Sequence, residues 1–176
     1  LVNYFVDMKM DVAIRNTPWM NNLASKILNT DIKALDKRAV VGAFVTFYWS
    51  GAMIGRFIGS YLTKSYPPNK ILGYFSVCAI LLLISSMNST GLFSMWSILA
   101  VGLFNSIMFP TIFTLSIENI EEQKPQASGI LCTMIVGGAI IPPLYGFLTD
   151  LSGFKTAIIL LITCYAYIYY FANKIK

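Results

Sequence analysis

The sequence has no histidine, only three cysteines and few charged residues, and these shortages exclude several classes of protein. Charged residues make up 12% of the 176 positions, against roughly 25% in soluble domains. The cysteines lie singly in apolar runs without a CxxC pair, so we expect no metal, no disulfide and no cofactor. The apolar runs also lack paired acids, a nucleophile with a base and the GxSxG motif, so an enzyme is not expected.

The abundant residues are apolar: 56% of the chain is hydrophobic and 14% is aromatic, the composition of an integral membrane protein. We expect a multi-pass protein of the cytoplasmic (inner) membrane, surrounded by lipid. The formal net charge of +5 comes mostly from loops and the carboxyl tail. It therefore indicates membrane orientation and does not indicate a nucleic-acid partner.

Five apolar stretches are each long enough to cross a hydrocarbon core of roughly 30 Å at about 1.5 Å per helical residue. They comprise residues 39–63, 71–87, 92–119, 127–149 and 156–172. The predicted fold is all-α: a transmembrane bundle over residues 39–176, preceded in residues 1–38 by the end of an earlier helix and an extracytoplasmic loop. Because residues 1–6 read as the end of a helix, we expect a part of a longer polypeptide. The alternative is a complete short protein with an apolar start.

The polar segment of residues 7–38 contains the pattern of one short helix. Thr17 can cap it, directly before a proline that suits the first helical position. Trp19, Leu23 and Ile27 then share one face, opposite polar side chains. We expect a helix that lies at the membrane interface. The alternative is a mobile loop whose apolar residues touch the bundle.

The first apolar stretch carries a glycine at every fourth position, namely Gly51, Gly55 and Gly59. At about 100° per residue these glycines share one helix face, where a neighbouring helix can approach closely. We therefore predict a helix-packing seam. Arg56 lies in the same stretch, where a charge needs a partner or a water-filled cavity.

Helix-breaking residues interrupt two of the later stretches. They are Pro110 in the third stretch and, in the fourth, Gly137, Gly138, Pro142 and Pro143. A bilayer supplies no water to freed backbone groups, so such breaks persist where neighbouring helices or a cavity satisfy them. We expect both helices to bend at a substrate site or a moving seam. The alternative is a static kink that improves packing.

Basic residues in the short loops indicate the orientation. One side holds a single lysine, Lys155, and the other side holds Lys64, Lys70, Lys124, Lys174 and Lys176. The positive-inside rule places the second group in the cytoplasm. The six basic residues within residues 7–38 favour the reverse orientation. We base the predicted orientation on the short loops.

A loop motif narrows the class of protein. The segment GFLTDLSGFK at residues 146–155 fits the pattern G-x-L-x-D-x-x-G-x-K/R of the major facilitator superfamily, and GSYLTKSYPPNK at residues 59–70 is a degenerate copy. The offset between Gly59 and Gly146 is 87 residues, as a repeat of three helices gives. The better copy lies on the side opposite to the usual one, which is a departure from the superfamily pattern.

Three longer segments make the resemblance specific: FYWSGAMIGRFIGS, FNSIMFPTIFTLSIENI and SGILCTMIVGGAIIPPLYGFLTDLSG. Together they resemble the fucose, galactose and glucose proton-symporter family of that superfamily. Met108 and Phe109 stand where the fucose branch has a Gln-Tyr pair, which favours the glucose/galactose branch. The resemblance implies the end of helix seven followed by helices eight to twelve of a permease. It also implies that the whole permease moves a hexose inward with a proton by alternating access.

Some residues of the apolar stretches are candidates for contact with a sugar. An amide can bond sugar hydroxyls, and an aromatic ring can cover the apolar face of a sugar. The candidates are Asn105, Met108, Phe109, Tyr48, Trp49, Met134 and Gly138. For each aromatic residue alone, plain packing is the more common role.

No acidic residue lies deep in an apolar stretch, since Glu118 and Asp150 both fall at helix ends. A proton relay needs an intramembrane carboxylate or histidine, so the coupling group is expected in the missing amino-terminal helices. We also expect Arg56 to pair with Glu118 as a conformational latch; the alternative is that Arg56 reaches water or lipid phosphate. The alternative to a sugar transporter is a non-transporting truncated remnant or one half of a split transporter.

Overall fold

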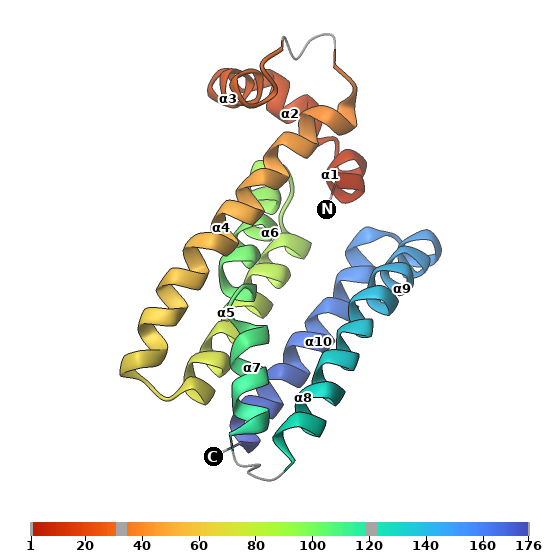
Figure 1. Ribbon diagram of the computed structural model, residues 1–176. Helices are drawn as coiled ribbons and strands as arrows, with labels where there is room; N and C mark the ends of the chain where they lie inside the picture. The colour runs from red at the N-terminus through yellow and green to blue at the C-terminus, as the bar shows by residue number, and fades with distance from the viewer. Residues whose placement is uncertain (1, 31–34, 119–122, 176) are drawn as a thin grey trace.

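The computed structural model describes residues 2–30, 35–118 and 123–175, and the regular elements of these residues are all helical (Figure 1). In chain order they are α1 (Val2–Asp7), α2 (Met10–Asn16), α3 (Pro18–Leu28), α4 (Lys37–Ser65), α5 (Pro68–Asn88), α6 (Leu92–Asn105), α7 (Met108–Ile117), α8 (Lys124–Thr133), η2 (Met134–Val136), α9 (Gly137–Ser152) and α10 (Phe154–Lys174).

Five helical segments are long and apolar enough to cross a membrane, which confirms the predicted number of spans. α4, α5 and α10 each form one span. α6 and α7 together form another, and α8, η2 and α9 form the last. The observed starts lie within a few residues of the predicted ones, so the apolar length of each stretch was a sufficient guide to the spans.

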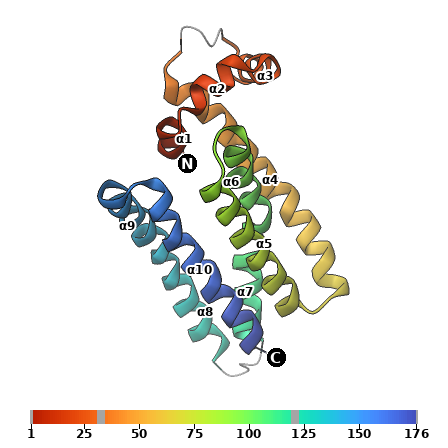
Figure 2. The same ribbon diagram turned by 180° about the vertical axis from the view of Figure 1, so that it is seen from behind.

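The spans lie side by side, and their connections gather at two ends (Figures 1 and 2). The α4–α5 link, the start of α8 and the end of α10 lie at one end, while α1, α2 and α3 lie at the other. The short loops that were expected to share one side of the membrane therefore do share one end of the bundle. α6 packs on both α4 and α5, and α10 packs on both α5 and α9.

The glycine seam of α4 packs against the third span. A Cβ added to Gly55 would collide with the carbonyl oxygen of Leu103, and one added to Gly59 would lie 2.7 Å from Ile107 Cδ1. The contact is reciprocal, since a Cβ on Gly102 of α6 would lie 2.5 Å from the backbone oxygen of Tyr48. The two backbones can therefore approach this closely only because side chains are missing from both helices.

The third span is broken one turn before its proline. Ser106 and Ile107 form a turn between α6 and α7, and Pro110 follows inside α7. A proline has no N–H to donate, and its ring clashes with the carbonyl group four residues earlier, which here belongs to Ser106. The helix is therefore interrupted close to Pro110, where the bend was predicted, and Asn105 is the last residue of α6 before the interruption.

The fourth span is interrupted at its glycine pair. The 3₁₀ turn η2 ends directly before Gly137, whereas Pro142 and Pro143 lie inside α9 without a break in the helix. The expectation of loosening on both sides of the middle is therefore wrong for the proline side.

Between α1 and α4 the chain holds one helix that was predicted, α3, and one that was not, α2. α3 begins at the expected proline, but the Thr17 hydroxyl donates to the carbonyl oxygen of Ala13 at 2.8 Å and makes no capping bond. α2 was missed: the sequence pattern treated residues 7–16 as loop, yet Met10 and Ile14 are fully buried there.

The buried face of α3 is offset by one residue from the predicted apolar face. Its fully buried residues are Met20 and Ala24, whereas Trp19 is 54% and Ile27 41% exposed. Trp19 instead stacks on Trp96 of α6, with ring centroids 6.3 Å apart. α3 is therefore fixed to the bundle through a face one residue further along the helix.

The α4–α6 contact predicts a clear difference between two glycines of the same helix. Gly55→Ala should lower the free energy of unfolding by about 1–3 kcal/mol, because the new methyl group overpacks against the Leu103 backbone. Gly42→Ala should be neutral or slightly stabilising, because a Cβ there meets no atom within 4 Å. Thermal unfolding of detergent-solubilised protein measures both. Equal effects of the two substitutions would show that the seam is not tightly packed.

Candidate functional site

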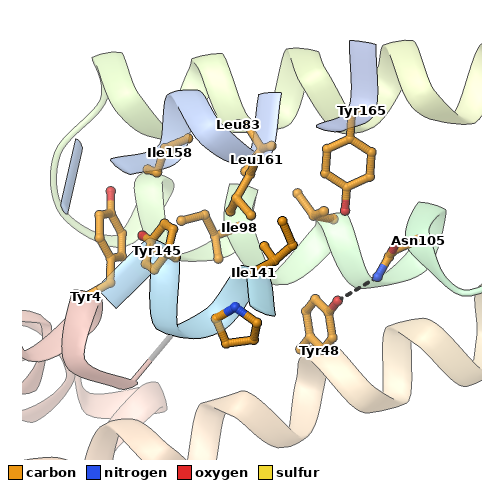
Figure 3. A pocket seen from close by; sticks show the side chains of 12 residues that line it. Tyr4, Tyr48, Leu83, Ile98, Asn105, Ile141, Tyr145, Ile158, Leu161 and Tyr165 are labelled. Carbon is orange, nitrogen blue, oxygen red and sulfur yellow. Dashed lines mark hydrogen bonds between the residues drawn. The ribbon is translucent and has the colours of Figure 1, made fainter. Parts of the chain in front are cut away.

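A cavity of about 350 Å³ lies between α1, α4, α5, α6, α9 and α10 (Figure 3). Its lining residues are mainly apolar, with hydroxyl or amide groups on five of them, and they comprise Tyr4, Tyr48, Leu83, Ile98, Val101, Asn105, Ile141, Pro142, Tyr145, Ile158, Leu161 and Tyr165. None of the described residues that line it carries a charged side chain. A cavity of this kind suits a neutral ligand that carries both apolar surface and hydroxyl groups.

The polar groups at one end of the cavity are Tyr48, Asn105 and Tyr165 (Figure 3). The Asn105 side-chain amide donates a hydrogen bond to the Tyr48 hydroxyl at 3.2 Å. Asn105 is the last residue of α6, directly before the turn that separates α6 from α7. The break in the third span thus brings an amide to the cavity, and the α4–α6 contact brings Tyr48 to the same point.

A buried hydroxyl cluster lies at the other end of the cavity. The Tyr4 hydroxyl is 3.1 Å from the Ser94 hydroxyl and 3.3 Å from the Ser86 hydroxyl, which are 2.9 Å from each other. Each serine hydroxyl also lies within hydrogen-bond distance of the backbone oxygen of the other serine, at 3.2 Å for Ser86 and 3.0 Å for Ser94. The cluster therefore ties α1 to the connection between α5 and α6, and the ring of Tyr4 packs edge-on against Phe154 of α10.

A second cavity, of about 430 Å³, adjoins the first. Its lining residues come from α1, α9 and the start of α10, and they are Val2, Asn3, Pro142, Tyr145, Gly146, Thr149, Asp150 and Phe154. Pro142 and Tyr145 line both cavities. The two cavities thus share part of α9 as a wall, and together we call them the groove along α9.

The structure brings only some of the predicted sugar contacts to this groove. Tyr48 and Asn105 line it, and Gly138 does not. Met108 is buried in the core, with 2% of its surface exposed. The remaining candidates are exposed and line neither cavity; they are Trp49, Phe109 and Met134.

Sequence reasoning missed three tyrosines of the groove, Tyr4, Tyr145 and Tyr165. Each lies in an apolar run where periodicity does not show which face looks into the bundle. Their one signal in the sequence is a polar tip on an otherwise apolar face, which needs a partner when it is buried.

The expected Arg56–Glu118 ion pair is not formed in this structure. Both side chains are exposed, and Arg56 makes no hydrogen bond or ion pair with any residue that the structure describes. The glycine seam turns Gly55 toward α6 and leaves the adjacent Arg56 outside that contact. Among the described residues, no group of histidine, cysteine and acidic side chains could hold a metal ion.

We next compare this chain with proteins of known sequence and structure. No protein-family model matches the chain. It is 48% identical to the glucose/galactose transporter of Brucella abortus over 127 residues, which cover 72% of this chain and 31% of that protein. It is 38% identical to a putative glucose/galactose transporter of Helicobacter pylori (85% and 36% covered), and 32% identical to the L-fucose-proton symporter of Escherichia coli (76% and 32% covered).

The fold matches that of FucP, a major facilitator superfamily transporter solved in the outward conformation. The TM-score is 0.77 at 24% sequence identity, and the match covers 99% of this chain and 42% of that one. The chain thus spans about a third of the length of the sequence relatives that it matches.

A bundle of five membrane spans with this fold corresponds to part of the transporters that it matches. The chain belongs to the major facilitator superfamily, within the group that contains the glucose/galactose transporters and L-fucose-proton symporters. These relatives are transporters and not enzymes. The predicted fold class, membrane location and family are therefore confirmed, and the partial coverage is what a carboxyl-terminal half gives.

The hydroxyl cluster predicts how firmly α1 is held. Tyr4→Phe should destabilise the protein by about 1 kcal/mol, because it removes the hydroxyl that lies within hydrogen-bond distance of both serine hydroxyls, while the two serines remain close to each other. Tyr167→Phe is the control, since that tyrosine of α10 is 70% exposed. Thermal unfolding compares the two variants. A Tyr4→Phe variant as stable as the control would show that the cluster does not hold α1.

Proposed function

We propose that this chain forms the carboxyl-terminal half of a sugar transporter that carries a hexose, glucose or galactose before fucose, across the cytoplasmic membrane together with a proton. The names of its relatives support sugar as the cargo. The observation within the chain that carries the proposal is the hydrogen-bonded pair of Tyr48 and Asn105 in a cavity without charged side chains.

The chemistry of that end of the cavity suits a sugar. A hexose presents a rim of hydroxyl groups and an apolar face of C–H groups. The Asn105 amide can donate two hydrogen bonds and accept two, and the hydroxyls of Tyr48 and Tyr165 can each donate and accept. The aromatic rings supply flat apolar surface for the sugar face. A neutral site also gives no affinity to a phosphorylated or acidic sugar, which would need a cation beside it.

The two interrupted spans supply the moving parts of the proposed transporter. The turn at Ser106 and Ile107 and the 3₁₀ turn η2 both lie near the middle of a membrane span. Helices interrupted in this way lie at the substrate sites of many transporters, where alternating access rocks one half against the other. Asn105 lies directly before the turn between α6 and α7, so a change in the angle between these two helices would move a proposed sugar contact.

Proton coupling would depend on the amino-terminal part of the transporter. Among the described residues, Glu118 follows the last residue of α7 and Asp150 lies two residues before the end of α9, so both acids are near span ends. A relay at the depth of the sugar therefore needs a carboxylate supplied by the other half. This chain would contribute sugar contacts and would not itself carry the proton.

Orientation follows from the same proposal. The end of the bundle that holds Lys64, Lys70, Lys124 and Lys174 would face the cytoplasm, and the end that holds α1, α2 and α3 would lie outside. The alternative function, a non-transporting remnant or one half of a split transporter, shares this arrangement. The two alternatives differ only in whether an amino-terminal half accompanies the chain.

Transport by the full-length protein tests the sugar site. Reconstituted vesicles should accumulate labelled glucose or galactose when a proton gradient points inward. Asn105→Leu should raise the half-saturating sugar concentration about tenfold or more, since a lost hydrogen bond to a buried polar group costs about 1–3 kcal/mol. Asn88→Leu is the control, because the Asn88 amide donates to its own helix at the end of α5. The 176-residue chain alone should not accumulate sugar.

Absence of uptake by the full-length protein under any gradient would favour the non-transporting alternative. If the full-length protein takes up sugar and Asn105→Leu leaves the half-saturating sugar concentration unchanged, the protein is a sugar transporter but Asn105 does not contact the sugar.

The Arg56–Glu118 latch is tested separately. In a conformation with the cytoplasmic end closed, the long arginine side chain would lean toward the level of Glu118. Transport by Arg56→Ala, Glu118→Ala and the double variant should then show a coupling energy of about 0.5–3 kcal/mol. Arg56→Ala combined with Asp150→Ala is the control and should be additive, since Asp150 lies near the other end of the bundle. Additivity in both pairs would show that Arg56 and Glu118 do not meet.

A further inference from the structure

One acidic residue has no role in the proposed function. Asp150 lies two residues before the end of α9, and its side chain makes no hydrogen bond or ion pair with any residue that the structure describes. It is the acid of the loop motif at residues 146–155. The degenerate copy of the motif has Thr63 at this position, and the Thr63 hydroxyl donates to the carbonyl oxygen of Ser60 at 3.1 Å. The complete copy therefore supplies a carboxylate that no described residue satisfies.

Asp150 lines the second cavity, the one of about 430 Å³, together with two other polar side chains. Asn3 of α1 has an amide without a hydrogen-bond partner among the described residues, so this amide can donate and accept. The Thr149 hydroxyl donates to the carbonyl oxygen of Tyr145 at 2.8 Å, and its oxygen can still accept. Two helices thus contribute hydrogen-bonding groups to this cavity that remain able to bind a ligand.

Aromatic rings form another part of the wall. Tyr145 and Phe154 both line the cavity, and Phe154 is held by edge-on packing against Tyr4, with ring centroids 5.8 Å apart. A carboxylate can accept hydrogen bonds from two neighbouring hydroxyls of a sugar, and an aromatic ring can cover the C–H face of the sugar. None of the described residues that line the cavity is basic, so Asp150 would repel an anionic sugar without compensation. The lining therefore suits a neutral sugar.

This cavity lies between one end of the bundle and the proposed sugar site. α1, the end of α9 and the start of α10 all lie at the end of the bundle that holds α2 and α3 (Figures 1 and 2). The start of α6 is at this end too, because Ser94 contacts Tyr4. Asn105 is the last residue of the 14-residue α6, roughly 20 Å deeper at a rise of about 1.5 Å per residue. Since Tyr145 lines both cavities, a sugar that enters from this end reaches Asp150 before Asn105.

We propose that the second cavity is an entry site for a neutral hexose, in which the Asp150 carboxylate accepts hydrogen bonds from sugar hydroxyls before the sugar passes Tyr145 and reaches Asn105. This rests on the proposed sugar transport and on the extracytoplasmic position of α1. Asn3 and Thr149 bind other hydroxyls of the same sugar. The negative charge of Asp150 disfavours uronic acids and sugar phosphates at the entrance. The uncharged first cavity then receives sugars that have already been selected for neutrality.

Protection of a cysteine by sugar tests the entry site in the full-length protein. Val2, which lines the second cavity, is replaced by cysteine in a variant whose three cysteines of this chain are serines, and intact cells are labelled with a membrane-impermeant maleimide. Glucose or galactose should slow the labelling. Galacturonate at the same concentration should not, and neither should sodium chloride in place of choline chloride. Val12→Cys is the control: Val12 is 49% exposed and lines neither cavity, so sugar should not change its labelling.

The role of the Asp150 charge is tested in the same assay. Asp150→Asn should raise the sugar concentration that gives half-maximal protection about three- to tenfold, because hydrogen bonds to a charged group are stronger than those to a neutral one. Asp7→Asn should leave this concentration unchanged, since Asp7 is an exposed residue of α1 that lines neither cavity. Asn105→Leu should also leave it unchanged, because Asn105 lines only the first cavity.

Three results would overturn the proposal: no labelling of Val2→Cys in cells without sugar, protection by sodium instead of sugar, or protection that Asp150→Asn does not weaken. If Val2→Cys does not reach the membrane, Gly146→Cys takes its place, because Gly146 lines the same cavity and a Cβ there meets no atom within 4 Å. Sugar uptake without protection would contradict the entry site alone. Protection without uptake would support the entry site and contradict the proposed transport.

Discussion

The close approach of α4 and α6 is the contact on which the rest of the bundle depends. Gly55 and Gly102 face each other's helix with no room for a Cβ, so the two backbones touch where side chains normally separate them. In a membrane there is little hydrophobic drive between helices, and such close packing supplies much of the attraction. It also fixes the rotation of α4, which directs Tyr48 toward Asn105 and leaves Arg56 exposed.

The same contact connects packing with the proposed function. The break after Asn105 could not be tolerated beside lipid, because freed backbone groups have no water to bond there. α4 packs along this part of the third span, with Gly59 against Ile107 of the turn. A seam of small residues therefore supports the irregular backbone that presents a sugar contact. Bending at this point and sliding along this seam would be mechanically linked.

Much of the fold could be predicted from the sequence because a bilayer can be crossed only by long apolar helices. Within such helices, glycine and proline occur where a neighbouring helix packs closely or satisfies the freed backbone groups. The five spans, the α4 glycine face and the break near Pro110 follow from those demands. The rotation of each helix about its own axis does not follow from the requirements of the bilayer. Met108 and Phe109 are adjacent, yet one is buried and the other exposed, and Thr17 bonds backwards to Ala13 instead of capping α3. Such details depend on neighbouring helices that no local pattern describes.

Likewise, only part of the candidate site could be predicted from the sequence. Asn105 and Tyr48 could be found because a polar or amphipathic side chain within a membrane span needs a partner. Tyr145 and Tyr165 could not, since their role depends on a groove formed by spans far apart in the sequence.

A structure of the full-length transporter by electron cryomicroscopy is the most direct measurement of whether the α4 glycine seam organises this bundle. We predict that α4 and α6 cross where Gly55 and Gly102 meet the facing backbone, with an interaxial distance at or below the usual range of about 8–10 Å. Helices held further apart there, with Gly55 turned toward lipid, would contradict it.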